Sequence, residues 1–348
     1  MSDQPPRMSD PPQMSLADIA KASGVSLATA SRALNDAYGV AASTRQRVLD
    51  IARQLDYVVS PDAARLAGGA TRRVALVVPH IERWFFGELV SGLEHELSAA
   101  GLDVLLYHVG DAEDRAEFFA ELPARRKVDA VVVVALPVGE SERLRLELMG
   151  VTIVAAGGQS AAYPYVRIDD EVAARQAVDH LLRLGHTRIG MISAADPDQP
   201  GWPSLPGRSQ GYYAALAAAG ITLDERLVIT VDWGGTSGAD AMARLLSLPT
   251  PPTAVYAHSD EVALGAMRTI RRAGLRIPED ISIVGIDDHP LADLVDLTTV
   301  HQPVREQGIT AARMLLGLLR GDTDVDQAVT LPTYLVPRRT TAAAPGRL

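Results

Sequence analysis

Apolar residues near the start of the chain recur at helical spacing in three short segments separated by polar turns. The first segment carries Leu16, Ile19 and Ala20 at the i, i+3, i+4 spacing of one helix face. The second segment runs from Leu27 to Leu34, after a turn at Gly24. The third carries an apolar stripe made of Val48, Ile51, Ala52 and Leu55. Two short helices across a tight glycine turn, braced by a third helix, are typical of a helix-turn-helix unit.

Polar residues at the predicted helix starts support these three helices. Ser15 is placed to cap the first helix, and Asp18 occupies its third position, where a carboxylate favours the exposed N–H groups. Ser26 is placed to cap the second helix. Ser43 and Gln46 have the spacing of a capping box for the third. Each of the three helices is therefore expected to begin at a capping side chain.

From Arg72 onward, apolar strand-like runs alternate with amphipathic helices. The strand candidates are Val74–Val78, Val104–His108, Ala130–Val134, Ile189–Ile192, Val255–His258 and Ile281–Ile286. The helix candidates, each stopped by a glycine, are Glu88–Ala99, Val172–Leu184, Gly211–Ala219 and Glu261–Ala273. This alternation is typical of a parallel α/β sheet. Because about 270 residues exceed one simple doubly wound sheet, we expect two lobes with a cleft between them.

The acidic charge of the chain belongs to this second part. The chain has 33 basic and 43 acidic residues, which gives a formal net charge of −10. An acidic balance argues against a nucleic-acid partner, because DNA-binding proteins usually need a positive field. Residues 1–69, however, contain seven basic and seven acidic groups, so the acidic excess lies entirely after them. Any DNA-binding surface on the helical segment is therefore expected to be local and modest.

What the sequence lacks disfavours several classes of protein. The chain has no cysteine, which excludes disulfides, cysteine nucleophiles and zinc–thiolate sites. The common nucleotide-binding, zinc-protease and serine-hydrolase motifs are absent, so we predict no enzyme, no catalytic residue, no metal and no cofactor. The longest apolar run, Ala130–Leu136, is too short to span a membrane, and Met1–Gln13 is polar. We expect a cytoplasmic protein without a membrane partner. Its residues 1–14 are expected to form a disordered leader.

The segment Ser15–Asn35, with the sequence SLADIAKASGVSLATASRALN, closely resembles the DNA-binding motif of the LacI family of bacterial transcription regulators. The resemblance continues through Thr44–Val48 and Leu55–Tyr57. Further segments that resemble the effector-domain landmarks of the family are Gly185-His186, Ser259–Gly265, Val284–Asp288 and Leu297–Val300. The resemblance therefore covers nearly the whole chain, and several independent motifs in the family's order are more specific than any one of them.

The resemblance implies an all-α helix-turn-helix headpiece followed by an α/β effector domain with two lobes, of the periplasmic-binding-protein-like type I fold. The expected domains are a helix-turn-helix domain at 15–59, a hinge helix and linker at 60–71, a ligand-binding and dimerisation domain at 72–340 and a tail at 341–348. Within the large domain, the N-lobe is expected at about 72–168 and 302–330, and the C-lobe at about 169–301 and 331–340.

For DNA binding, the resemblance places the second helix in the major groove. It implies that Leu27, Ala28 and Arg32 face the bases and that Thr29 and Ser31 contact phosphates. Asn35, at the end of the motif, is also expected to bind DNA. Arg32 can pair with guanine through two hydrogen bonds. The alternative for Arg32 is a solvated surface position. Leu27 also has a second interpretation, because its spacing to Ala30 and Leu34 would place it on the core stripe instead.

The segment 60–69 resembles the hinge of the family. Leu66 falls where the family places a leucine that wedges between base steps in the minor groove and kinks the duplex. Such a wedge needs a second copy across a two-fold axis, which implies a homodimer. The alternative is a plain interdomain linker that ends in Gly68-Gly69.

For the effector, the resemblance implies a small-molecule site at strand ends in the interlobe cleft. The positions that match ligand contacts of the family are Phe85, Phe86, Asp169, Arg208, Trp233, Ser259 and Asp287. An aromatic face with nearby charged groups suits a sugar, whose C–H face stacks while its hydroxyls form hydrogen bonds. The alternative for Phe85 and Trp233 is core packing, and for Asp169 and Asp287 it is capping at strand ends.

The function implied is a ligand-responsive, DNA-binding transcriptional regulator without enzyme activity. We expect a repressor that binds a double-stranded, pseudo-palindromic operator as a homodimer and is released by a small sugar-like effector. The polarity stays open, because a co-repressor would use the same parts. The alternative is a sugar-binding receptor of a transport system with no DNA-binding role. No leucine heptad follows the core, so we expect no coiled-coil tetramer.

Overall fold

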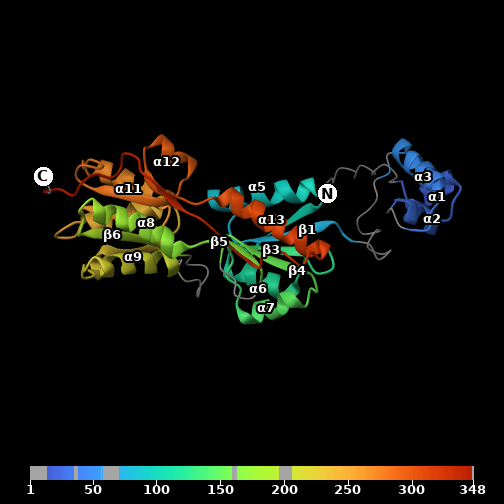
Figure 1. Ribbon diagram of the computed structural model, residues 1–348, viewed down its shortest axis with the longest axis horizontal. Helices are drawn as coiled ribbons and strands as arrows, with labels where there is room; N and C mark the ends of the chain where they lie inside the picture. Colours follow the sequence, from blue (N-terminus) through green and yellow to red (C-terminus); the bar gives the residue numbers. More distant parts are fainter. Residues whose placement is uncertain are drawn as a thin grey trace, which may run out of the picture. The chain divides into compact units, whose positions relative to one another are not determined.

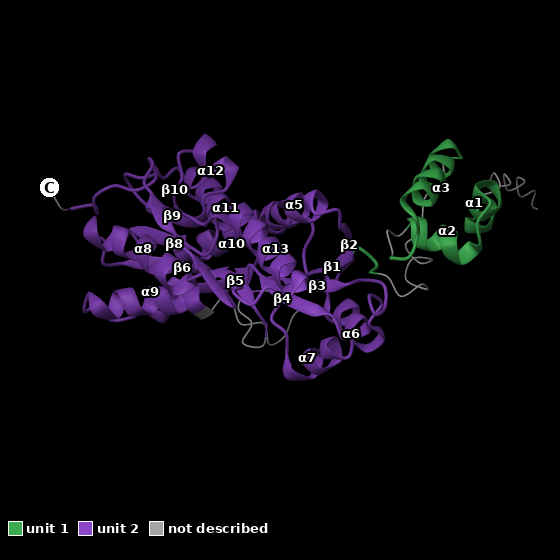
Figure 2. Ribbon diagram, turned by 45° about the vertical axis from the view of Figure 1, so that its right-hand side comes forward, with its two compact units in different colours: residues 1–72 green, residues 73–348 purple. Residues whose placement is uncertain are grey.

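The computed structural model describes residues 14–34, 38–55, 57, 70–158, 163–195 and 206–346. The chain divides into two compact units, residues 1–72 and residues 73–348 (Figure 2). No helix in these described ranges is long and apolar enough to cross a membrane.

The described residues of the first unit form three helices around a small core. The helices are α1 (Leu16–Ser23), α2 (Leu27–Leu34) and α3 (Ala42–Gln54). Their packing buries Ile19, Ala33, Val48 and Ala52. Each helix contributes to this core, so the predicted helix-turn-helix arrangement with a bracing third helix is confirmed.

The predicted caps of α1 and α2 are confirmed, whereas the predicted cap of α3 is wrong. The Ser15 hydroxyl accepts a hydrogen bond from the Asp18 N–H at 3.3 Å, and the Asp18 carboxylate accepts one from the Ser15 N–H at 2.9 Å. The Ser26 hydroxyl accepts from the Thr29 N–H at 3.2 Å. In α3, Ala41 is the capping residue and makes no side-chain capping bond.

The Ser43–Gln46 capping box does not form because α3 begins one residue before Ser43. Ser43 already belongs to the first helical turn, since the Arg45 N–H donates to the Ala41 carbonyl at 2.9 Å. Gln46 is used elsewhere, because its Nε2 donates to Asp50 Oδ1 at 2.9 Å. The spacing of the two residues matched a capping box, but their position relative to the helix start did not.

The second unit contains two six-stranded sheets in its described residues. The first sheet has the order β11-β5-β4-β3-β1-β2, and every adjacent pair in it is parallel. Its strands are β1 (Arg73–Val78), β2 (Asp103–His108), β3 (Ala130–Val134), β4 (Thr152–Ala156), β5 (Tyr165–Ile168) and β11 (Ala328–Leu331).

The second sheet has the order β12-β10-β9-β8-β6-β7, and only its edge strand β12 is antiparallel to its neighbour. Its strands are β6 (Ile189–Ala195), β7 (Val228–Asp232), β8 (Ala254–Ala257), β9 (Ser282–Asp287), β10 (Thr298–His301) and β12 (Tyr334–Val336). We call the first sheet with its helices the N-lobe and the second sheet with its helices the C-lobe.

Helices cover both faces of each sheet (Figure 1). In the N-lobe, α5 (Trp84–Ala99) and α13 (Val304–Arg320) cover one face, while α6 (Ala112–Glu121) and α7 (Glu140–Glu147) cover the other. The C-lobe helices are α8 (Asp170–Arg183), α9 (Pro206–Ala218), α10 (Gly235–Leu246), α11 (Asp260–Arg272) and α12 (Pro290–Leu294), with a short 3-10 turn at Glu225–Leu227. There, α8 and α9 lie on one face, and α10 and α11 lie on the other.

The strand side chains alternate between two cores in each lobe. In β1, Val74, Leu76 and Val78 face α5 and α13, while Ala75 and Val77 face α6 and α7. A strand buried on both faces has no polar face, which explains its continuous apolar sequence. The described lobes therefore confirm the predicted two-lobed α/β fold with parallel sheets.

The strand order of each lobe leaves room for a ligand-binding site at the carboxyl ends of its central strands. In both sheets the first strand of the lobe lies between the second and the third, which is the doubly wound order. Ligands of such sheets bind beyond the carboxyl ends of the strands, where the strand order reverses. The candidate effector residues come after β1, β5, β7 and β8, at the last residue of β9, or on α9.

Candidate DNA-binding and effector-binding sites

The second helix of the first unit presents part of its surface to solvent. Ala30 and Ala33 are buried and face the core, whereas Ala28 and Arg32 are exposed. The Leu27 side chain is 54% exposed. The core interpretation of Leu27 is therefore wrong, because the helix turns this side chain away from Ile19 and Val48.

Most of the predicted DNA-contact residues share this surface of α2. Arg32 extends along the helix, and its Nε donates to the Ala28 carbonyl at 3.2 Å. Thr29 is half-buried, and its hydroxyl lies 2.8 Å from the Ser26 hydroxyl. Ser31 is also half-buried. The predicted contacts Asn35 and Leu66 lie outside the described residues.

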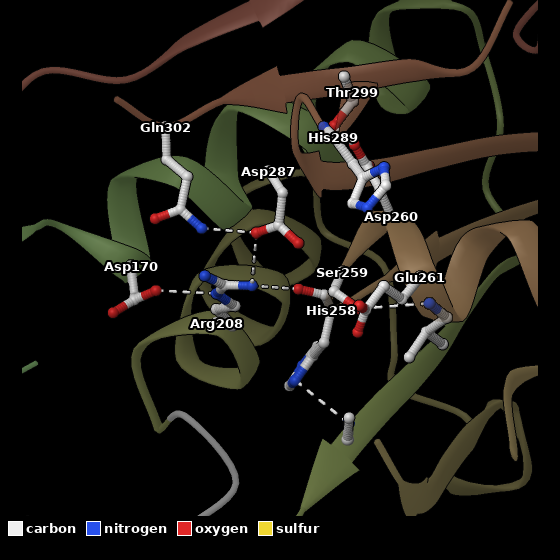
Figure 3. Close-up of polar contacts among 12 residues, drawn as sticks. Asp170, Arg208, His258, Ser259, Asp260, Glu261, Asp287, His289, Thr299 and Gln302 are labelled. Carbon is white, nitrogen blue, oxygen red and sulfur yellow. Dashed lines mark hydrogen bonds and ion pairs between the residues drawn. The ribbon is translucent and has the colours of Figure 1, made fainter. Parts of the chain in front are cut away.

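In the second unit, a buried arginine is the centre of a polar cluster at the carboxyl ends of the C-lobe strands (Figure 3). Arg208 of α9 is only 5% exposed. Its Nε donates to Asp170 Oδ1 at 2.8 Å, and its Nη1 lies 3.7 Å from Asp287 Oδ1. The same nitrogen donates to the His258 carbonyl. A buried guanidinium needs such partners, because an unpaired charge away from water is strongly unfavourable.

Asp287 ends β9 in an unusual backbone conformation. Its φ is 138°, and that of the following Asp288 is 57°, both outside the range that non-glycine residues prefer. The carboxylate is 6% exposed and accepts a hydrogen bond from Gln302 Nε2 at 2.5 Å. Burial raises the pKa of Asp287, and the positive charge of Arg208 opposes that shift. Backbone strain of this kind persists where the surroundings impose it, and it concentrates at functional sites.

A second buried carboxylate, Asp260, lies beside the first. It is the first residue of α11, and its two oxygens accept from the Thr299 hydroxyl at 2.6 Å and from the His289 N–H at 2.9 Å. Burial and the charge of Asp287 both raise the pKa of Asp260. Gly285 of β9 allows this approach, because a Cβ there would lie 2.1 Å from Asp260 Oδ1.

Two predicted effector residues are helix caps. Ser259 is buried and accepts from the Val262 N–H at 3.3 Å, so it caps α11. Asp169 accepts from the Glu171 and Val172 N–H groups, both at 3.1 Å, so it caps α8. For Asp169, this agrees with the capping alternative stated from the sequence. Its neighbour Asp170 is the residue that reaches Arg208.

The aromatic candidates lie in different surroundings. Phe86 is buried in the N-lobe core and only 5% exposed, so its side chain offers little surface to a ligand. Phe85 is half-buried and packs edge-on against it, with ring centroids 5.2 Å apart. Trp233, just after β7, is half-buried, and the Arg83 guanidinium carbon lies 4.2 Å from its ring centroid.

The structure therefore joins Arg208 and Asp287 directly and adds residues that sequence reasoning missed. These are Asp170, His258, Asp260 and Gln302. Burial, followed by the charge of Arg208, lowers the pKa of His258, so this side chain is neutral near pH 7. The Asp169-Asp170 and Ser259-Asp260 pairs at helix starts were the available signals. They could not show that Asp170 reaches Arg208, or that Asp260 pairs with Thr299 and His289, while the preceding residue caps the helix.

We also searched the described ranges for a metal site and for a second cavity. No group of three or more histidine or acidic residues there is arranged to hold a metal ion. A hollow of about 680 Å³ lies beside the C-terminal half of α13 and the loop after it, and none of the predicted effector residues lines it.

The sequence matches two known families and several known regulators. Residues 15–60 match the family described as bacterial regulatory proteins of the lacI family, and residues 178–341 match a periplasmic binding protein-like domain. The HTH-type transcriptional repressor CytR of Escherichia coli is 34% identical over 332 residues, which cover 94% of this chain and 96% of the relative. The HTH-type transcriptional regulator DegA of Bacillus subtilis is 32% identical, covering 93% of this chain and 97% of that protein.

Solved structures agree with these relatives. The lac repressor dimer bound to operator and the anti-inducer ONPF has a TM-score of 0.81 and 28% identity, over 95% of this chain and 99% of that one. The complex of the transcriptional regulator CelR with cellobiose has a TM-score of 0.70 and 31% identity, over 94% of this chain and 99% of the other.

The helix-turn-helix unit and the two-lobed domain together define a DNA-binding transcriptional regulator with a sensor domain of the periplasmic-binding type. The chain belongs to the lacI family of bacterial regulatory proteins. Its relatives are transcriptional regulators and not enzymes, so the prediction of a non-enzymatic regulator is confirmed, and the transport-receptor alternative is not supported.

Proposed function

We propose that this regulator represses transcription by binding a pseudo-palindromic operator as a homodimer, and that a small sugar-like effector at the Arg208–Asp287 cluster releases it. The observation that carries the DNA-binding part is the exposed surface of α2 in a helix-turn-helix unit. The homologous lac repressor structure contains a dimer bound to its operator, which supports the same partner for this chain.

On DNA, Arg32 is the main source of base discrimination in α2. Leu27 and Ala28 offer only apolar contact, whereas the Arg32 guanidinium can form two hydrogen bonds with a guanine. Residues 15–69 carry six basic against five acidic groups, so one copy has little net charge with which to neutralise phosphates. We infer that two copies together supply the phosphate contacts for tight binding.

The effector part rests on the polar cluster of the C-lobe. Arg208 and Asp287 offer a guanidinium fork and carboxylate oxygens, which can donate to and accept from sugar hydroxyls. Homologous structures are complexes with cellobiose and with ONPG, which favours a sugar-like ligand for this chain. Effector binding would favour the arrangement of the lobes that binds the effector more tightly. If that arrangement binds the operator less well, operator affinity falls, and the fall is limited by how differently the two arrangements bind the effector.

A mobility-shift experiment with the full-length chain tests the DNA-binding proposal. Operator fragments are first selected from random genomic DNA with the wild-type protein. Arg32→Ala should then lower affinity for the selected fragments by roughly 5- to 150-fold, because a bidentate arginine–guanine contact contributes about 1–3 kcal/mol of discrimination.

Arg53→Ala is the matched control for this experiment. Arg53 is exposed on α3 and pairs with Asp50 at 3.4 Å, so its loss removes one positive charge without touching the exposed surface of α2. This variant should bind the selected fragments nearly as the wild type does. Equal losses in the two variants would contradict the role of Arg32, and an absence of sequence-selective binding at physiological salt would refute the repressor.

A further inference from the structure

Arg83 of the N-lobe reaches across to the C-lobe. It directly precedes α5, and its side chain is 16% exposed. Its Nε donates to Glu261 Oε2 at 3.4 Å. Glu261 lies in the first turn of α11, so the two partners are 178 positions apart in the sequence and belong to different sheets.

The same guanidinium lies against an aromatic ring of the C-lobe. Its carbon is 4.2 Å from the ring centroid of Trp233, which is the distance of a cation–π contact. Trp233 is in turn packed against the apolar core of the C-lobe. Arg83 therefore contacts both a ring and a carboxylate of the opposite lobe.

The next residue makes a second contact between the lobes. The rings of Trp84 and His289 have their centroids 4.8 Å apart, at an interplanar angle of 57°. His289 follows β9. Two consecutive residues at the start of α5 thus contact the C-lobe beside α11, β7 and β9. All of these contacts lie beyond the carboxyl ends of strands rather than in the segments that connect the lobes, so they would break if the lobes separated.

Arg83 is also electrostatically linked to the Arg208–Asp287 cluster. Burial raises the pKa of Asp287, and the charges of Arg208 and Arg83 both oppose that shift. Glu261, the partner of Arg83, acts on the same carboxyl in the opposite direction. The interlobe contact therefore borders the candidate effector site.

We propose that Arg83 is a positioning residue of the sensor domain, which holds the two lobes together through Trp233 and Glu261. We call these three residues the Arg83 clasp. A contact present in only one arrangement of the lobes stabilises that arrangement relative to any other. The clasp therefore sets how far the ligand-free chain populates separated lobes, and its link to operator release rests on the proposed function.

The interlobe distance of the ligand-free protein tests the clasp directly. The natural chain has no cysteine, so cysteines introduced by Ser98→Cys on α5 and Ala243→Cys on α10 are unique labelling sites, and both positions are exposed. Single-molecule energy transfer between a donor and an acceptor then reports the distance between the lobes. The labelled chain is mixed with excess unlabelled chain, so that a dimer carries only one labelled pair.

Arg83→Ala should shift or broaden the distance distribution relative to the wild type. Glu261→Gln, which keeps the size of the side chain but removes its charge, should produce a smaller change in the same direction. Arg83→Lys keeps the charge but not the planar group that stacks on Trp233, so it should lie between the wild type and Arg83→Ala. Adding Glu261→Gln to Arg83→Ala should change nothing further, because the pair is already broken.

Arg313→Ala is the matched control. Arg313 pairs with Glu96 at 3.0 Å inside the N-lobe, so its removal breaks an ion pair that does not join the lobes. This variant should keep the wild-type distribution. If Arg83→Ala, or the conservative Arg83→Lys and Glu261→Gln where Arg83→Ala fails to fold, also keep the wild-type distribution, the clasp is refuted. The experiment contains neither DNA nor effector, so that result would leave the proposed repressor function untouched.

Discussion

Arg208 shows how burial gives a single side chain its role. The guanidinium is planar and remains charged at every physiological pH, so it can hold Asp170 and the His258 carbonyl in a fixed geometry. Asp287 lies slightly farther from it, at 3.7 Å. A polar ligand that contacts Asp287 would therefore meet a carboxylate whose orientation is already determined by Arg208 and Gln302.

Asp260 gives a pH dependence with a defined sign. Its pKa in the folded chain is raised above the ordinary value of 3.8, so between pH 3.8 and this raised pKa the folded state holds more protons than the unfolded state. The free energy of unfolding therefore falls as the pH rises through this window. Asp260→Asn should reduce that fall, because asparagine carries no titrating carboxyl group. Its amide can still accept from the His289 N–H and can donate to the Thr299 hydroxyl, so the local structure is kept. Thermal unfolding of both proteins across the pH range measures the difference.

Asp280→Asn is the control of opposite sign. Arg276 holds the pKa of Asp280 below its ordinary value, so this carboxylate stabilises the fold above pH 3.8 and loses that effect as the pH falls toward its folded pKa of about 2. Its removal should therefore lower stability near neutral pH and not at strongly acidic pH. Parallel pH profiles of the Asp260→Asn and wild-type proteins would contradict the assignment of Asp260.

At the scale of elements, close helix pairs organise both lobes. In the N-lobe, α5 and α13 meet at Gly92 and Gly308, where an added Cβ would lie 2.2 Å from the carbonyl oxygens of Arg305 and Leu89, respectively. In the C-lobe, α10 and α11 meet at Gly238 and Gly265 in the same manner. Because glycine has no side chain, the two backbones of each pair can approach more closely than any larger residue would permit.

Gly92→Ala should destabilise the second unit by about 1–3 kcal/mol, because the new methyl group collides with the backbone of α13. Gly87→Ala, in the same helix, is the matched control. No atom lies within 4 Å of a Cβ at Gly87, so alanine should stabilise α5 by about 0.5–1 kcal/mol through its helix propensity. Urea unfolding of the two variants measures both effects, and equal midpoints would exclude the close approach of α5 and α13.

The helices also show how far local pattern predicts an element. The caps Ser15 and Ser26 were predicted because a capping bond joins residues three positions apart. The start of α5 was predicted too late, at Glu88, because the helix begins at Trp84 and includes Phe85 and Phe86. These aromatic residues form the first turn of α5, where Phe86 enters the core and Trp84 meets His289 of the other lobe.

At the scale of the whole molecule, the same topology occurs twice. Both sheets have the doubly wound strand order, and each receives its last strand from the end of the chain, β11 in the N-lobe and β12 in the C-lobe. The chain therefore passes between the lobes more than once, so that several segments connect them. The net charge of −10 belongs to the part after residue 69, so the DNA-binding unit is not acidic.

The effector proposal predicts a ligand-dependent stability of the whole chain. A sugar that binds the folded state should raise the unfolding free energy by about 2.7 kcal/mol at a concentration of 100 times its Kd. A thermal-shift screen of sugars that includes cellobiose measures this rise. Asp287→Asn should remove the rise, whereas Asp280→Asn, which lies before the opposite end of β9 and pairs with Arg276, should retain it. A shift by purines or amino acids alone would refute the sugar assignment.

The sequence by itself determined the helix-turn-helix unit, the alternating α/β pattern and two of the three predicted caps. These features depend on periodicity and on bonds between residues a few positions apart, so they can be read locally. The family resemblance added Arg208 and Asp287 as candidate residues, but no local pattern could connect them with Asp170 and Asp260.

Only the tertiary structure decided those connections, because the strand order brings distant segments to the same end of the sheets. Burial there raises the pKa values of Asp260 and Asp287 and requires Arg208 to be paired. The contact of Arg83 with Glu261 likewise depends on how one lobe lies against the other. Hydrophobic patterning specifies which elements form, whereas their packing decides which charged groups meet.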